Sequence, residues 1–209
     1  MKRVAVIDYG AGNLRSVAKA LQHVAEAGSI QVTANAKDLR EATHIVLPGV
    51  GAFADCMRGL TSLPGMLAAM EEEVLQRRKP FLGICVGMQM LFERGIEHGV
   101  HQGLGWLKGE VVRLEGKPGL RIPHMGWNTL HFAHPHPVTK GLETEPHVYF
   151  VHSYHCKAKD SGDILATTDY GQPITAMVAR DNILGTQFHP EKSQQSGLAL
   201  LHNFLTGCK

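Results

Sequence analysis

A cysteine between two glycines is the first residue of this chain whose setting suggests chemistry. The short apolar run 81–84 ends at Cys85, with Gly83 and Gly87 two residues to either side, and a helix-compatible run follows. This pattern predicts a nucleophile elbow, in which a strained turn projects the reactive side chain and glycines let strand and helix approach. The start of the helix would favour the thiolate. The alternative is a small buried hydrophobe, the usual role of a free cysteine.

A possible base for that cysteine follows another predicted strand. His189 and Glu191 flank Pro190 at the end of the last apolar run, so both side chains can project from one sheet edge. A nucleophilic thiol needs a base, and the base needs an acceptor on its other ring nitrogen. We therefore predict a triad of Cys85, His189 and Glu191. The alternative for His189 is a histidine that only caps a strand.

A glycine-rich turn supplies a possible oxyanion site. Gly49, Val50 and Gly51 follow the predicted strand 44–47, at a carboxyl end where open α/β sheets place their ligands. Glycine lets backbone amides approach and bind an oxyanion closely. A plain turn is the alternative.

Two other patterns favour ordinary turns over ligand sites. Gly10-x-Gly12 lies between a strand and a helix, but Arg15 stands where a dinucleotide-binding motif has its third glycine. His131, His134 and His136 lie in a proline-rich stretch without a nearby Cys, Asp or Glu, which favours a solvated loop over a metal site. We expect no metal and no cofactor.

The hydrophobic periodicity predicts an α/β fold. A β-branched run at 4–7 is typical of a strand in a parallel sheet, whereas the second half shows strands with no long helix between them. The helix after residue 14 is expected to end at Gly28, and the charged runs 71–73 and 77–79 are expected to be solvated. Strands are predicted at 4–7, 30–34, 44–47, 81–84, 106–114, 121–132, 147–156, 164–169, 174–179 and 183–188, and helices at 14–24, 35–42, 63–78 and 193–205.

Composition excludes several protein classes. The chain has 209 residues, 44% of them hydrophobic and 19% charged, which is typical of a globular protein. A formal net charge of +2 gives no reason to expect nucleic acid or membrane binding. The four scattered cysteines indicate neither a disulfide framework nor a thiolate zinc site. With no apolar run of about 18 residues and no signal peptide, we expect a cytoplasmic protein.

Taken together, these residues resemble the class I (triad) glutamine amidotransferases over essentially the whole chain. Residues 83–89 read G-I-C-V-G-M-Q and residues 188–191 read F-H-P-E, as in that family. The resemblance implies one domain over residues 1–209, a single three-layer unit with a mixed, mainly parallel sheet, flanking helices and an antiparallel extension. Finer motifs are similar to those of glutaminase subunits of imidazole glycerol phosphate synthases, at residues 8–13, 47–51, 123–128, 149–154 and 189–193.

The resemblance implies a mechanism and site residues. Cys85 would attack the side-chain amide of glutamine, His189 would protonate the leaving ammonia, and water would hydrolyse the glutamyl thioester. Backbone amides at the oxyanion hole, in Gly49, Val50, Gly51 and Val86, would stabilise the tetrahedral oxyanion. The amino-acid end of glutamine would be held by Gln89, Ser153 and Tyr154, although helix surface and strand packing are the simpler interpretations of these three.

The resemblance also implies a separate partner, because free ammonia would be protonated in water. In the resembling family the partner is a (β/α)8-barrel cyclase in a heterodimer, and it uses the ammonia in histidine biosynthesis. The implied interface consists of Asn13, Met125, Trp127, Asn128 and Lys192, although Trp127 is equally compatible with internal packing. Two alternatives remain: an amidotransferase component for anthranilate or aminodeoxychorismate synthesis, and a non-catalytic regulatory module.

Overall fold

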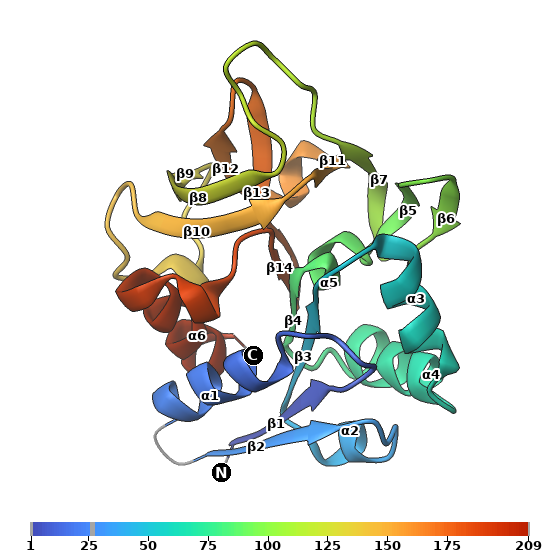
Figure 1. Cartoon of the computed structure of the whole chain (residues 1–209). Coiled ribbons are helices and arrows are strands. Elements are labelled where there is room, and N and C mark those ends of the chain that lie inside the picture. The colour runs from blue at the N-terminus through green and yellow to red at the C-terminus, as the bar shows by residue number, and fades with distance from the viewer. Residues whose placement is uncertain (1, 26–27, 209) are drawn as a thin grey trace.

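The core of the computed structural model, which describes residues 2–25 and 28–208, is an eight-stranded mixed sheet (Figure 1). Its strand order is β2-β1-β3-β4-β14-β13-β12-β9. The first five strands in this order are mutually parallel, and β13, β12 and β9 continue the sheet in antiparallel pairs. The strands are β1 (Lys2–Ile7), β2 (Gly28–Thr33), β3 (His44–Gly49), β4 (Phe81–Cys85), β9 (His131–Phe132), β12 (Ile164–Asp169), β13 (Pro173–Arg180) and β14 (Ile183–Thr186).

Helices cover both faces of the parallel part. In Figure 1, α1 and α6 lie on one side of β3 and β4, while α3 and α4 lie on the other. Because β3 and β4 are covered on both sides, every residue in them is buried. The helices are α1 (Leu14–Val24), α2 (Asp38–Glu41), α3 (Phe53–Ser62), α4 (Met66–Met70), α5 (Val86–Gln89) and α6 (Gln194–Gly207), with a π-helical segment at Glu71–Gln76.

Two smaller sheets flank the antiparallel side of the large sheet. One pairs β8 (His124–Thr129) with β10 (His147–His152). The other has the order β11-β7-β5-β6, formed by β11 (Tyr154–Ala158), β7 (Leu107–Arg113), β5 (Phe92–Ile96) and β6 (Val100–Gln102). This arrangement confirms the predicted α/β class with a mainly parallel sheet and an antiparallel extension. Short 3-10 turns occur at Pro137–Thr139, Ser161–Asp163 and Pro190–Lys192.

Several predicted boundaries were wrong. The predicted strand 147–156 is two strands in different sheets, separated at Ser153, and the predicted strand 121–132 is β8 followed by β9. The helix after Cys85 is only four residues long, because the chain enters β5 at Phe92. Helix α3 was not predicted. Gly28 is not a helix cap: α1 ends with Ala25 as its C-cap and Gly28 opens β2.

The predicted helix 63–78 contains an irregularity that buries a charge. The amide of Arg77 donates to the carbonyl of Glu72 at 2.9 Å, five residues back, so the last turn is π-helical. A π turn holds an extra residue and shifts the side chains that follow relative to an α-helical pattern. Glu73, expected in solvent, is fully buried 2.7 Å from Lys79 Nζ, while the apolar Leu75 is 44% exposed.

Candidate active site

The elbow at Cys85 has the predicted geometry. Cys85 ends β4 with φ +56° and ψ −111°, a conformation that costs a non-glycine residue about 1–3 kcal/mol. A Cβ on Gly87 would lie 1.9 Å from the carbonyl oxygen of Leu47, so only glycine fits where α5 crosses β3. Cys85 is 4% exposed, and Gln187 Nε2 donates to its sulfur at 3.7 Å.

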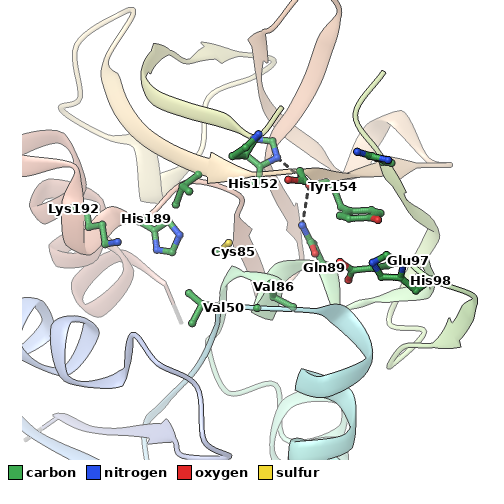
Figure 2. Close-up of a pocket in the computed structure, with 15 residues that line it drawn as sticks. Val50, Cys85, Val86, Gln89, Glu97, His98, His152, Tyr154, His189 and Lys192 are labelled. Carbon is green, nitrogen blue, oxygen red and sulfur yellow. Dashed lines mark hydrogen bonds between the residues drawn. The ribbon is translucent and has the colours of Figure 1, made fainter. Parts of the chain in front are cut away.

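The imidazole of His189 lies beside that sulfur, and Figure 2 shows both side chains at the same end of the cavity. His189 Nδ1 is 2.8 Å from Glu191 Oε1, and both side chains are fully inaccessible to solvent. His189 Nε2 makes no hydrogen bond within the described part of the chain, which leaves it available to a reacting atom. The three side chains of the predicted triad therefore meet at one sheet edge.

The electrostatics of His189 favour its protonated form. Burial by itself lowers the pKa of His189, but interactions with Cys85 and Glu191 outweigh the burial and raise the pKa to about 10. At neutral pH the ring is therefore a cation that can act as a proton donor. Asn13 Nδ2 also donates to Glu191 Oε1, at 3.2 Å, and so helps to fix the carboxylate.

The glycine-rich turn after β3 lies against the elbow. Val50, Gly51, Cys85 and Val86 all line a cavity of about 560 Å³, whereas Gly49 is packed behind it, where a Cβ would come within 2.6 Å of the Gly87 amide nitrogen. No hydrogen bond from the Val50 or Gly51 amide occurs among the described residues, so neither donor is engaged by another of these residues.

Two side chains hold the carbonyls of this turn from behind. Tyr9 Oη donates to the carbonyl of Pro48 at 2.6 Å, and Cys56 Sγ donates to that of Val50 at 3.4 Å. Neither Tyr9 nor Cys56 lines the cavity. Burial raises the pKa of the Cys56 thiol, which keeps it a neutral donor.

The other end of the cavity contains the residues expected to bind glutamine. Gln89, Ser153 and Tyr154 all line it, as Figure 2 shows for Gln89 and Tyr154. Gln89 Nε2 donates to the Tyr154 carbonyl and to Gln187 Oε1, both at 3.0 Å. The strand-packing interpretation of Ser153 and Tyr154 is incomplete, since both residues border open space.

The sequence of the chain matches a known family model. Residues 5–208 match the model described as glutamine amidotransferase class-I. The chain belongs to the class I glutamine amidotransferase family. Among curated relatives, imidazole glycerol phosphate synthase subunit HisH of Rhodospirillum rubrum is 54% identical over 209 residues, which cover 97% of this chain and 98% of the relative. The protein of the same name from Mesorhizobium japonicum is also 54% identical, over 211 residues that cover 97% of this chain and 98% of the relative.

Solved structures agree on the fold. A crystal structure described as a glutamine amidotransferase has a TM-score of 0.73 at 20% identity, and the match covers 98% of this chain and 98% of that chain. PurLQS from Thermotoga maritima gives a TM-score of 0.70 at 22% identity, with 100% of this chain and 99% of that chain covered. At these identities the likeness shows the class I amidotransferase fold alone.

The expected partner residues of this family member fall into two groups. Met125 and Trp127 are 61% and 47% exposed on β8, and Lys192 is an exposed residue that also lines the cavity. Asn128 is half-buried beside them. Asn13 differs, because it is 6% exposed and its amide contacts Glu191 instead of an open face.

Sequence reasoning missed several residues that line the cavity. Glu97, His98 and Arg113 come from the β5–β6 hairpin and from the end of β7, and His152 comes from the end of β10. Only the hairpin sheet brings the first three to the cavity, and that sheet was not predicted. Within residues 2–25 and 28–208, no three His, Cys, Asp or Glu side chains form a possible metal site, and no helix is long and apolar enough to cross a membrane.

Proposed function

We propose that this chain is the glutaminase subunit of an imidazole glycerol phosphate synthase and that it supplies ammonia to a cyclase partner. The observation that carries the proposal is the meeting of Cys85, His189 and Glu191 beside a turn whose Val50 and Gly51 amides have no partner among the described residues, with Cys85 and His189 lining the cavity. The curated relatives of the same length carry this name, which favours histidine biosynthesis over anthranilate or aminodeoxychorismate synthesis.

In the proposed first half-reaction, the Cys85 thiolate, whose proton His189 has taken, attacks the side-chain amide carbon of glutamine. Negative charge moves to the carbonyl oxygen, where the amides of Val50, Gly51 and Val86 receive it; one such donor is typically worth about 3 kcal/mol. His189, protonated at neutral pH, gives its proton to the amide nitrogen. The C–N bond breaks, ammonia leaves, and a glutamyl thioester remains on Cys85.

In the second half-reaction, water hydrolyses the thioester. His189, now neutral, takes a proton from the attacking water as a general base, and Glu191 keeps the ring in place through Nδ1. The thioester C–S bond breaks, which releases glutamate and restores the starting pair. This cycle needs no cofactor.

The charges of the cavity fit the amino-acid end of glutamine. Glu97 and Arg113 have opposite signs and both line the cavity, Glu97 at the end away from Cys85 (Figure 2) and Arg113 opposite Tyr154 in the strand register, so we assign them to the α-ammonium and the α-carboxylate. Ser153 and Tyr154 would add backbone contacts, and Gln89 would hold the carbonyl of Tyr154.

We further propose a heterodimer with a (β/α)8-barrel cyclase, in the cytoplasm. The exposed Met125 and Trp127 supply an apolar anchor of the kind found in interface cores. Trp127 packs edge-on against Tyr149, and Lys192 lies 5.9 Å above the Tyr149 ring, so this face continues to the cavity mouth. Ammonia released there would enter the partner without crossing bulk water.

A glutaminase assay tests the proposed function. We expect slow glutamate release from the purified chain, much faster release when the cyclase from the same organism and its nucleotide substrate are added, and none from Cys85→Ala in the same complex. An inactive wild-type complex, or an active Cys85→Ala complex, would refute the proposal.

A further inference from the structure

A pair of buried histidines links the exposed strand β8 to the glutamine pocket. His124 at the start of β8 lies opposite His152 at the end of β10 in the strand register, and they are 2% and 6% exposed. His124 Nδ1 is 2.9 Å from His152 Nε2. The triad chemistry described above uses neither residue.

His152 spans the point where the chain changes sheets. Strand β10 pairs with β8, and the next strand, β11, pairs with β7, so Ser153 lies between two sheets, and its carbonyl accepts from the Leu114 amide at 2.9 Å. His152 Nδ1 is 2.9 Å from the carbonyl oxygen of Tyr154, two residues on, and closes this turn (Figure 2). The same carbonyl accepts from Gln89, so two side chains fix the carbonyl of Tyr154, a residue that lines the cavity.

Hydrogen bonds run from Asn128 through His124 and His152 to the Tyr154 carbonyl, and the groups at the two ends determine which atom donates in each bond. A carbonyl can only accept, so Nδ1 of His152 carries the proton and Nε2 of a neutral ring must accept from Nδ1 of His124. At the other end, Asn128 Nδ2 donates to the carbonyl of Asp169 while its Oδ1 accepts from the Thr129 amide, so Nδ2 is the atom that faces His124 Nε2, at 3.2 Å. Both ends require neutral rings protonated at Nδ1.

The surroundings of His124 support a fixed, uncharged ring. It is stacked against Phe150 with a centroid distance of 4.7 Å and against Tyr170 at 4.0 Å. Burial lowers the pKa of His124 to about 4, and burial followed by the neighbouring histidines lowers that of His152 to about 3. Rotation of either ring would break the chain of hydrogen bonds, and rotation of His124 would also open the stack.

We propose that His124 and His152 are positioning residues that hold the Tyr154 carbonyl, and with it the Ser153–Tyr154 segment, in the conformation that binds glutamine. The proposal rests on the glutaminase function above. Successive side chains of a strand face opposite sides, so Met125 and Trp127 point outward while His124 and Asn128 point inward. The pair therefore lies directly behind the proposed docking face.

The first test observes the protons and is independent of any activity. Full-length chain labelled with ¹⁵N-histidine should show, at pH 7, two neutral rings protonated at Nδ1, assigned by their loss in His124→Leu and His152→Leu. Either ring protonated at Nε2, or charged at pH 7, would overturn the proposal.

The second test measures kinetics in the complex with the cyclase. His152→Leu should raise the glutamine KM about tenfold, the usual effect of losing one hydrogen bond to a positioned group, with kcat within about threefold. His152→Asn keeps a donor near the Nδ1 position and should recover most of the lost affinity. His147→Leu, an exposed position at the other end of β10, is the matched control and should leave KM unchanged.

The outcomes separate this proposal from the proposed function. An inactive wild-type complex would refute the glutaminase assignment and leave the proton pattern to be judged by NMR. Two results from an active complex would overturn the positioning role. One is a normal KM in His152→Leu, and the other is an equal loss of kcat in His152→Asn and His152→Leu at unchanged KM.

Discussion

At the scale of single residues, the protonation state of His189 follows from two neighbours that compete with burial. A buried imidazole normally loses its proton, yet the pKa of His189 is raised because Cys85 and Glu191 favour the cation more than burial disfavours it. The ring is therefore charged before substrate binds. This fits a reaction in which the amide nitrogen of glutamine must receive a proton before it leaves, because the unprotonated nitrogen is a poor leaving group.

Replacing the carboxylate tests this balance. In Glu191→Gln the pKa of His189 should fall from about 10, and glutaminase kcat in the complex should fall about 10²- to 10⁴-fold because the acid is no longer held protonated and oriented. The ¹⁵N and ¹H signals of His189, followed from pH 5 to 11, measure the shift. A titration still centred near 10 would contradict the assignment.

The same variant has a defined effect on stability. The raised pKa of His189 stabilises the fold fully below the unfolded value of about 6.5, and this contribution is lost as pH rises through the folded value of about 10. Glu191→Gln should therefore be less stable than the wild type at pH 6, and its stability should change less between pH 7 and 10. Urea unfolding at each pH measures both differences.

At the scale of elements, the site depends on a close crossing of α5 over β3. The glycines at 83 and 87 are required because their Cβ positions coincide with backbone, at 2.6 Å from the Gly87 carbonyl oxygen and at 1.9 Å from the Leu47 carbonyl oxygen. This crossing brings the Val50–Gly51 turn beside Cys85. The geometry of the oxyanion site is thus set by backbone packing.

Adding one methyl group at the crossing should disrupt it. Gly87→Ala should lower the free energy of unfolding by more than about 3 kcal/mol, because the obstructing atoms are backbone and cannot rotate away. Gly116→Ala is the control, since its Cβ would come no nearer than 3.9 Å to another residue. Equal stability of the two variants in urea unfolding would be inconsistent with the described packing.

The buried ion pair at the π-helical turn gives a second prediction at this scale. Lys79→Met should lower the free energy of unfolding by about 3–5 kcal/mol, because it leaves the fully buried carboxylate of Glu73 without its 2.7 Å partner. The double variant Glu73→Gln/Lys79→Met should recover much of that loss. Chemical denaturation of the two variants tests the pair, and a double variant no better than Lys79→Met would argue against it.

These elements also show where prediction from sequence ends. The elbow, the strand before Gly49 and the strand before His189 were predictable, because β-branched runs, glycines and proline determine the backbone conformation of their own short segments. The sheet that brings in Glu97 and Arg113 was not, since β7 pairs with β11 from a distant part of the chain and that pairing leaves no local signal in the sequence. His124 and His152 were missed for the same reason: their contact arises only from the β8–β10 register.

At the scale of the whole molecule, the buried histidines determine how the fold responds to acid. His44, His124, His152 and His155 are each at most 6% exposed, and burial lowers their pKa values to about 4, 4, 3 and 4. In the unfolded chain the same rings titrate near 6.5. As pH falls below that value, the unfolded state binds protons that the folded state does not, so acid favours unfolding.

Acid should therefore destabilise this protein steeply. Between about pH 6.5 and 4, each of the four histidines can remove up to ~1.4 kcal/mol of stability per pH unit. His155 offers the sharpest test, because neither of its ring nitrogens has a hydrogen-bond partner among the described residues, and His155→Leu therefore removes the titrating group without breaking a bond. In urea unfolding this variant should be more stable than the wild type at pH 5. The difference in stability between the two proteins should be smaller at pH 7. His147→Leu, at an exposed position, is the control, and an equal change in both variants would show that burial of His155 does not drive the acid response.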